Sequence, residues 1–132
     1  MKCLEKLPLY SAPVLRIAMV LVFLWFGTNQ LIHPAKWVSY LPEFILGFGI
    51  SDTQFVLANG AFEVIASILV LLGVYVRPVM ALLGAHLFGI AVVMGFDAIA
   101  VRDYGLALAT FAVAMNGQDQ WCLIWPKKSD IQ

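Results

Sequence analysis

The chain has 132 residues, of which 62% are hydrophobic and 12% are charged, and its formal net charge is zero. Soluble domains are about half apolar and about a quarter charged, so this composition indicates a membrane protein. The balance of charge predicts neither nucleic-acid binding nor an electrostatic lipid anchor, and the length allows one domain, with no room for a soluble enzyme beside the spans.

The first apolar run, residues 14–32, predicts a membrane-spanning helix, because crossing a bilayer takes about 20 such residues. Lys2 and Lys6 precede the run as they would in a signal peptide. The run is nevertheless too long for a signal peptide, and no small-residue cleavage site follows it. We therefore expect an uncleaved first span.

Residues 33–50 follow this span and carry Pro34 and Pro42, which prevent one continuous helix. Trp37 and Tyr40 suit the headgroup level of a bilayer and are expected to act as interfacial anchors. The segment therefore predicts a short helix that lies on the outer membrane face and covers the polar layer described below. An apolar loop packed on the helix ends is the alternative.

Three further spans are predicted, at residues 53–76, 78–95 and 97–116. Ser51 and Gln54 have the spacing of a capping box, which marks the start of the second span. Pro78 suits the first turn of the third span. The fourth span is extended back to residue 97, because an apolar run of residues 104–115 alone is too short to cross.

The distribution of lysine and arginine predicts the orientation of these spans. Only Lys36 and Arg102 fall on one side of a four-span arrangement. The other side holds Lys2, Lys6, Arg16, Arg77, Lys127 and Lys128. The positive-inside rule then places both termini in the cytoplasm. The predicted fold is an all-α, membrane-embedded antiparallel four-helix bundle with a short outer interfacial segment between the first two helices.

Polar side chains from three of these helices fall at nearly one depth. They are Asn29, Gln30, Asn59, Glu63, Arg102 and Asp103. With a rise of ~1.5 Å per residue, they lie ~18–26 Å above the cytoplasmic edge, whereas His86 lies at ~12 Å. Lipid offers such groups no water, so each needs a partner within the protein or a wet cavity.

Depth also predicts partners. Arg102 and Glu63 match in level and have opposite charge, so we expect them to pair. Asp103 is the neighbour of Arg102 in sequence and is expected to point elsewhere. Arg16 lies only ~3 Å from the edge, and the prediction is an interfacial anchor that snorkels to the surface rather than a partner of Glu63.

Two interpretations of the polar layer stay open: it locks the helix register, or it forms a ligand or proton site. The same choice applies to His86, as a packing residue or a ligand-binding one. No metal site is predicted, since His33 and His86 lie far apart without acidic partners at ligand spacing. The sequence contains no hydrolase or kinase motif. Cys3 and Cys122 are expected to serve as small apolar residues.

Several short motifs follow one another along the chain: Leu15-Arg16-Ile17, Phe26-Gly27 with Pro34, Asn59-Gly60-Ala61-Phe62-Glu63, Leu72-Gly73, Arg77-Pro78, and Val101-Arg102-Asp103-Tyr104-Gly105-Leu106. Taken in this order, they resemble the DoxX-like family of small four-helix membrane proteins. The resemblance covers about residues 15–120.

The family in turn resembles the small subunit of an archaeal thiosulfate:quinone oxidoreductase, and its members are linked to quinones or oxidative stress. The resemblance implies a four-helix fold in a prokaryotic plasma membrane, and a subunit that is not catalytic alone. Any electron-carrying cofactor would belong to a partner subunit, and a homo-oligomer is the other expected assembly. A quinone is the one redox molecule this chain could hold, through Arg102, His86, Asn29 or Gln30.

The leading prediction is therefore a small membrane subunit of a quinone-linked redox or oxidative-stress complex. An assembly factor or scaffold with a purely structural polar layer is the first alternative, and a small transporter or channel is the second. A slot for a lipid tail that opens to the side of the bundle would favour a quinone. A continuous water-filled path would favour transport. A sealed cluster in which every polar group is paired would favour a scaffold.

Overall fold

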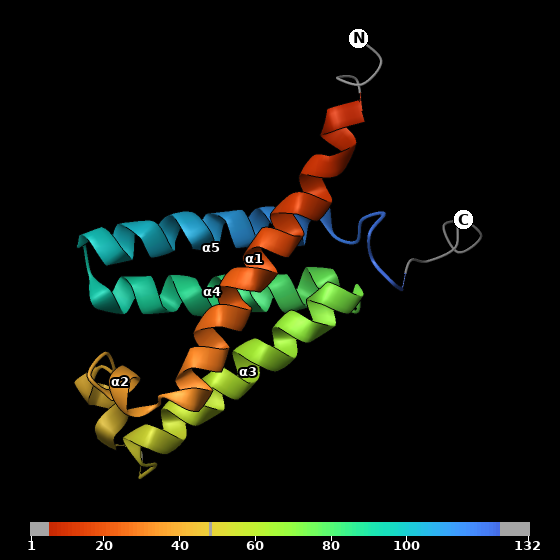
Figure 1. The fold of residues 1–132 in the computed structure, drawn as a ribbon. Helices are drawn as coiled ribbons and strands as arrows, with labels where there is room; N and C mark the ends of the chain where they lie inside the picture. Colours follow the sequence, from red (N-terminus) through yellow and green to blue (C-terminus); the bar gives the residue numbers. More distant parts are fainter. Residues whose placement is uncertain (1–5, 48, 125–132) are drawn as a thin grey trace.

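The structure, a computed structural model, describes residues 6–47 and 49–124 of the chain. Lys2, Cys3, Lys127 and Lys128 lie outside the described residues. Within the described part all regular structure is helical, in the order α1 (Leu7–Ile32), α2 (Ala35–Val38), η2 (Glu43–Gly47), α3 (Asp52–Leu72), α4 (Val76–Met94) and α5 (Ala98–Asn116) (Figure 1). Helices α1, α3, α4 and α5 are each long and apolar enough to cross a membrane.

The long helices match the predicted spans, with differences at their ends. α1 begins at Leu7, well before the predicted residue 14, and continues through Pro13. α3 ends at Leu72 rather than at residue 76, because Gly73 adopts a left-handed backbone with φ 85° that closes the helix. The amide nitrogens of Gly73 and Val74 then bond the carbonyls of Val70 and Leu69.

Two long helices begin with a polar cap, and the sequence predicts the first of them. The Ser51 side chain accepts from the Gln54 amide, and the Gln54 side chain accepts from the Ser51 amide, which confirms the capping box. Asp97 caps α5 by accepting from the Ala100 amide at 2.7 Å. α4 begins at Val76, so that Pro78 falls in its first turn, where a missing N–H costs no hydrogen bond.

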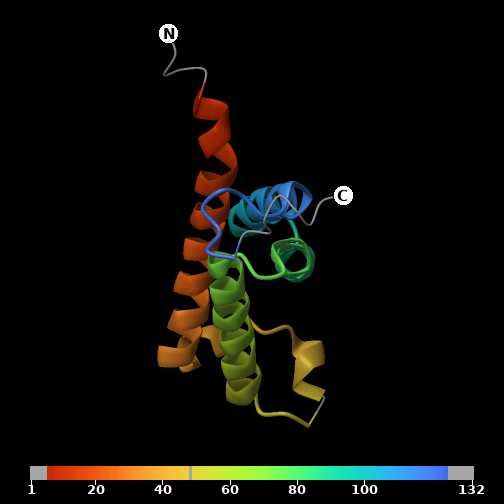
Figure 2. The ribbon, with the colours of Figure 1, turned by 90° about the vertical axis from the view of Figure 1, so that its right-hand side faces the viewer.

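The four long helices form two pairs, α1 with α3 and α4 with α5. The α1–α3 pair crosses the α4–α5 pair obliquely (Figures 1 and 2). The core lies where the pairs cross, and its buried members include Val20, Phe23, Val70, Met80 and Leu83. The predicted four-helix membrane bundle is therefore correct.

The two ends of the bundle differ. At one end, which we call the cap end, α2 and η2 lie between the helix ends (Figure 1). The start of α1 and the segment after α5 lie together at the opposite end, the terminal end (Figure 1). We call α2, η2 and the residues that join them the cap.

A pair of glycines sets the close approach of α1 and α3. A Cβ on Gly27 would lie 2.9 Å from the Gly60 carbonyl oxygen, and a Cβ on Gly60 would lie 2.8 Å from that of Gly27. Backbones can pass this closely only where side chains are absent. Gln30 and Glu63, each one turn beyond a glycine of this pair, are thereby brought together across the crossing.

Candidate functional site

A cavity of about 720 Å³ lies toward the cap end, between the two helix pairs and the cap. Its wall is mostly apolar and includes Phe23, Phe26, Leu41, Ile45 and Leu106. The polar side chains in the wall are Gln30, Asn59, Glu63, His86, Arg102 and Asp103, with Trp37 and Tyr40 contributed by the cap. The size lies within the roughly 300–1,000 Å³ of ligand sites, which are similarly apolar with a few polar groups.

Glu63 is the centre of the polar cluster and is buried. Gln30 Nε2 donates to Glu63 Oε2 at 3.3 Å, and Asn59 Nδ2 donates to Glu63 Oε1 at 3.1 Å. Asn59 also donates to Gln30 Oε1 at 2.8 Å, which closes a three-residue network between α1 and α3. A lone carboxylate at such a depth would cost roughly 2.5–3.5 kcal/mol, and these amide donors offset part of that cost.

His86 reaches the same carboxylate from α4 but has a free nitrogen. Its Nε2 lies 3.5 Å from Glu63 Oε1 without hydrogen-bond geometry, and this atom is buried with no hydrogen-bond partner. The ring packs edge-on against Phe62, with ring centroids 5.3 Å apart. A buried polar atom without a partner is costly, so His86 Nε2 is the group in this wall most in need of a ligand atom.

The predicted Arg102–Glu63 pair is wrong. Arg102 instead binds Asp103, its neighbour in sequence, with its Nε and Nη2 at 2.9 and 2.8 Å from Asp103 Oδ1. Asp103 is buried while half of the Arg102 side chain is exposed, so the long arginine folds back over the carboxylate. Arg102, Asp103 and Glu63 all line the cavity, but Glu63 is bonded to Gln30 and Asn59 whereas Arg102 is bonded to Asp103.

Asn29 takes no part in the Glu63 network. Its side-chain oxygen accepts from Trp37 Nε1 at 3.4 Å and so ties the cap to α1. Phe26, Trp37 and Tyr40 follow one another in edge contacts, with successive ring centroids 5.6 and 5.9 Å apart. Trp37 and Tyr40 therefore hold the cap over the cavity, as the sequence predicts for this segment; their level relative to a bilayer stays a prediction.

Arg16 is not the snorkelling anchor that its depth predicts. It is buried at 1% exposure, and its Nε and Nη2 donate to the two carboxylate oxygens of Asp119 at 2.6 and 3.1 Å. Its Nη1 donates to the carbonyls of Val70 and Leu71, at the end of α3. The guanidinium thus ties α1 to α3 and to the segment after α5, an arrangement we call the clasp.

Asp119 is the residue that the sequence reasoning missed. It accepts from the Trp121 amide at 2.9 Å, and its segment turns so that Cys122 packs against Gly73, where any Cβ would collide with the thiol side chain. A signal was present in the sequence: an arginine inside an apolar span needs an acidic partner, and Asp119 lies just beyond the fourth span at the same end.

The four long helices, the apolar surface and the buried polar cluster define a multi-pass integral membrane protein with an internal ligand-sized cavity. Comparison with family profiles matches the DoxX family over residues 12–96. Because this match covers more than half of the chain, the protein belongs to the DoxX family. The matched part contains Arg16, Glu63 and His86, while Arg102 and Asp119 follow it. Searches of curated proteins and of solved structures found no significant match.

Proposed function

We propose that this protein binds a membrane quinone in the cavity at its cap end and serves as a small subunit of a quinone-linked redox or oxidative-stress complex. The observation that carries the proposal is the unpartnered Nε2 of His86 in the wall of a large, mainly apolar cavity. A quinone has the matching chemistry, because it joins an apolar ring and chain to carbonyl oxygens that accept hydrogen bonds.

The residues present fit such a ligand. His86 Nε2 lacks a partner, and half of the Arg102 side chain is exposed, so both can donate to a carbonyl oxygen. Gln30 and Asn59 lie beside them but already hold Glu63, so their role is to fix the carboxylate in place. When bound, a quinone carries electrons and protons through the membrane; the protein supplies hydrogen-bond donors and a dry, aromatic wall.

Two other functions have less support. A scaffold would have a sealed and fully paired cluster, whereas here one imidazole nitrogen is unpaired beside a cavity that is partly open. A channel or transporter would have polar groups along its whole path. Between the cavity and the terminal end, however, the core is mainly apolar and includes Val20, Met80 and Leu83, with Ser67 and Thr110 as isolated, fully buried polar members.

The proposal includes the setting of the protein. We place it in a prokaryotic plasma membrane with both termini in the cytoplasm, so that the cap end faces outward. The residues described here show no Cys or His set for an iron–sulfur cluster or metal, so electrons would come from a partner subunit that carries its own cofactor. A homo-oligomer is the other assembly to be tested.

Tryptophan fluorescence offers a direct test of binding. Trp25 and Trp37 line the cavity, and a quinone bound beside them quenches their emission. We expect decyl-ubiquinone, added to the detergent-purified protein, to quench in a saturable manner. Changing His86 to Leu should weaken binding about tenfold, the loss expected when one good hydrogen bond to the ligand disappears.

His33 provides the matched control, because it is an exposed histidine that does not line the cavity. Its change to Leu should leave the binding curve unchanged, and Trp37→Phe should reduce the amplitude of quenching. Quenching that does not saturate, or that His86→Leu leaves unaltered, would remove the support for a quinone at this site.

A further inference from the structure

The cavity has two lateral sides, and they are closed to different degrees. On the side of α1 and α5, the Phe26 ring fills the wall, with the Arg102 guanidinium carbon 5.8 Å from its centroid. Trp25 and Trp37 pack edge-on against the same ring, at centroid distances of 5.0 and 5.6 Å. Three aromatic rings and a cation therefore block this side.

The side of α3 and α4 has aromatic rings as well, but it has open space on α4. His86, Gly89 and Val93 share one face of α4, since they follow at spacings of three and four, and His86 shows that this face turns toward Glu63 of α3. Gly89 is exposed, and a Cβ placed on it would meet nothing within 4 Å. The wall is therefore open beside Gly89, about 4.5 Å along the helix axis from His86.

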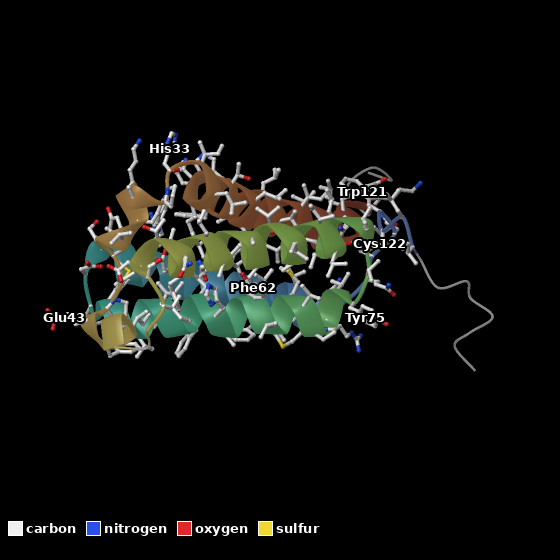
Figure 3. All side chains as sticks on the ribbon, turned by 90° about the horizontal axis from the view of Figure 1, so that it is seen from below. His33, Glu43, Phe62, Tyr75, Trp121 and Cys122 are labelled. Carbon is white, nitrogen blue, oxygen red and sulfur yellow. The ribbon has the colours of Figure 1, made fainter. Side chains whose placement is uncertain are left out.

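The other limits of the cavity leave this side as the route from the membrane. The cap covers the cavity at its end through Trp37, Tyr40 and Ile45. Toward the terminal end, Phe62 packs against His86 and the core at the α3–α4 boundary, where Figure 3 labels it. Between the cap and Phe62, the cavity is lined by Phe55 of α3, which shares a face with Phe62, and by Gly89 and Val93 of α4.

We propose that Phe55, Gly89 and Val93 form a lateral doorway through which the hydrocarbon chain of a lipid-soluble ligand passes between the membrane and the cavity. The identity of the ligand, a quinone with an isoprenoid chain, rests on the proposed function. Its rim is apolar and 49% of the Val93 surface is exposed, so the opening faces the hydrocarbon of a bilayer rather than water. The polar head binds near His86, and the chain leaves past Gly89.

Two forms of one quinone separate the doorway from the head site. The probes are decyl-ubiquinone and the same headgroup without a chain, each titrated against tryptophan fluorescence. Changing Gly89 to Phe should weaken binding of decyl-ubiquinone about tenfold, the factor expected when two methylenes lose their burial. Binding of the chain-free headgroup should stay at the wild-type level, because His86 and Glu63 are untouched.

Gly105 supplies a matched control, since an added Cβ there also meets nothing within 4 Å and the residue does not line the cavity. Gly105→Phe should alter neither titration. Val93→Trp is a second blocking variant, and Leu108→Trp, on an exposed position away from the cavity, is its control. The doorway is overturned if both blocking variants affect the two probes equally, or if they match their controls.

Failure of the proposed function gives a different result. If the wild type binds neither probe, the quinone assignment falls, and the doorway is then decided by native mass spectrometry of co-purified lipid. Less retained lipid in Gly89→Phe than in Gly105→Phe would support a doorway for another chain-bearing lipid. Equal retention in the two variants would overturn it.

Discussion

A guanidinium buried among apolar helices is stable only when its N–H groups find acceptors. Arg16 meets this condition with the Asp119 carboxylate and the carbonyls of Val70 and Leu71. A lysine could not reproduce it, because an ammonium is a point charge without the planar fork that binds a carboxylate through two nitrogens. The clasp thus explains why an arginine in particular occupies this position.

The first prediction concerns the clasp. Arg16→Leu should destabilise the bundle by about 3–5 kcal/mol, because Asp119 is left buried and unpaired. Arg16→Lys should still cost about 2–3 kcal/mol, because it loses charged hydrogen bonds. Thermal unfolding in detergent measures both. The control is Arg77→Lys, at an exposed arginine near the same end, which should leave the stability unchanged. If Arg16→Lys is as stable as this control, the clasp contributes little to the stability of the bundle.

The second prediction concerns which charges interact at the cap end. Glu63→Gln and Arg102→Gln should be additive within about 0.5 kcal/mol, since the two residues have separate partners. Asn59→Ala combined with Glu63→Gln should instead show a coupling of about 0.5–3 kcal/mol, because these side chains bond each other. Double-mutant cycles measure both values. Strong coupling of Glu63 with Arg102 would restore the pairing expected from depth alone.

At the scale of helices, the crossing of α1 and α3 determines whether the polar cluster exists. Gly27 and Gly60 lie against each other, and Gln30 and Glu63 meet because those backbones are close. The cluster therefore depends on two residues that have no side chains of their own. A small displacement of either helix would lengthen the Gln30–Glu63 bond, which is already 3.3 Å.

The third prediction follows from this crossing. Gly60→Ala would place a Cβ 2.8 Å from the Gly27 oxygen, so it should cost about 1–3 kcal/mol as an overpacked contact. It should also weaken quinone quenching, because Gln30 and Glu63 separate. Gly105→Ala, in open space on α5, should be neutral or stabilise by up to about 1 kcal/mol. Equal melting temperatures for the two variants would contradict a tight crossing.

For the whole molecule, four spans require both termini to lie on one side of the membrane. The start of α1 and the segment after α5 meet at the terminal end, where the clasp joins them (Figure 1). The proposed topology makes this end the cytoplasmic one, because the positive-inside rule places the lysine- and arginine-rich side of the sequence there. In this proposed topology the cap and cavity belong to the outer half of the bilayer.

The fourth prediction tests this topology. Reporters that are active only in the cytoplasm should work when fused to either terminus, and a reporter active only outside should work when inserted after His33, near the start of the cap. A cysteine that replaces Ser39 should react with a membrane-impermeant thiol reagent added to intact cells. An outward signal from one terminus alone would contradict an even number of spans.

The sequence by itself determined the class and the four helices, and it grouped polar residues that line one cavity in the structure. Span length follows from bilayer thickness, and a charge within an apolar span is rare because it is costly. Both features can therefore be recognised in the sequence alone. Ser51 and Gln54 marked the start of α3 for a similarly local reason, the need to cap free amides.

Only the tertiary structure decided which polar groups pair. Depth fixes a residue's height along a helix but not its direction around the axis, so Glu63 and Arg102 share a level yet face different neighbours. Arg16 reaches its partner Asp119 only because the chain turns back over α3 after α5. Helix rotation and such chain reversals depend on packing against the whole bundle, which local sequence patterns do not encode.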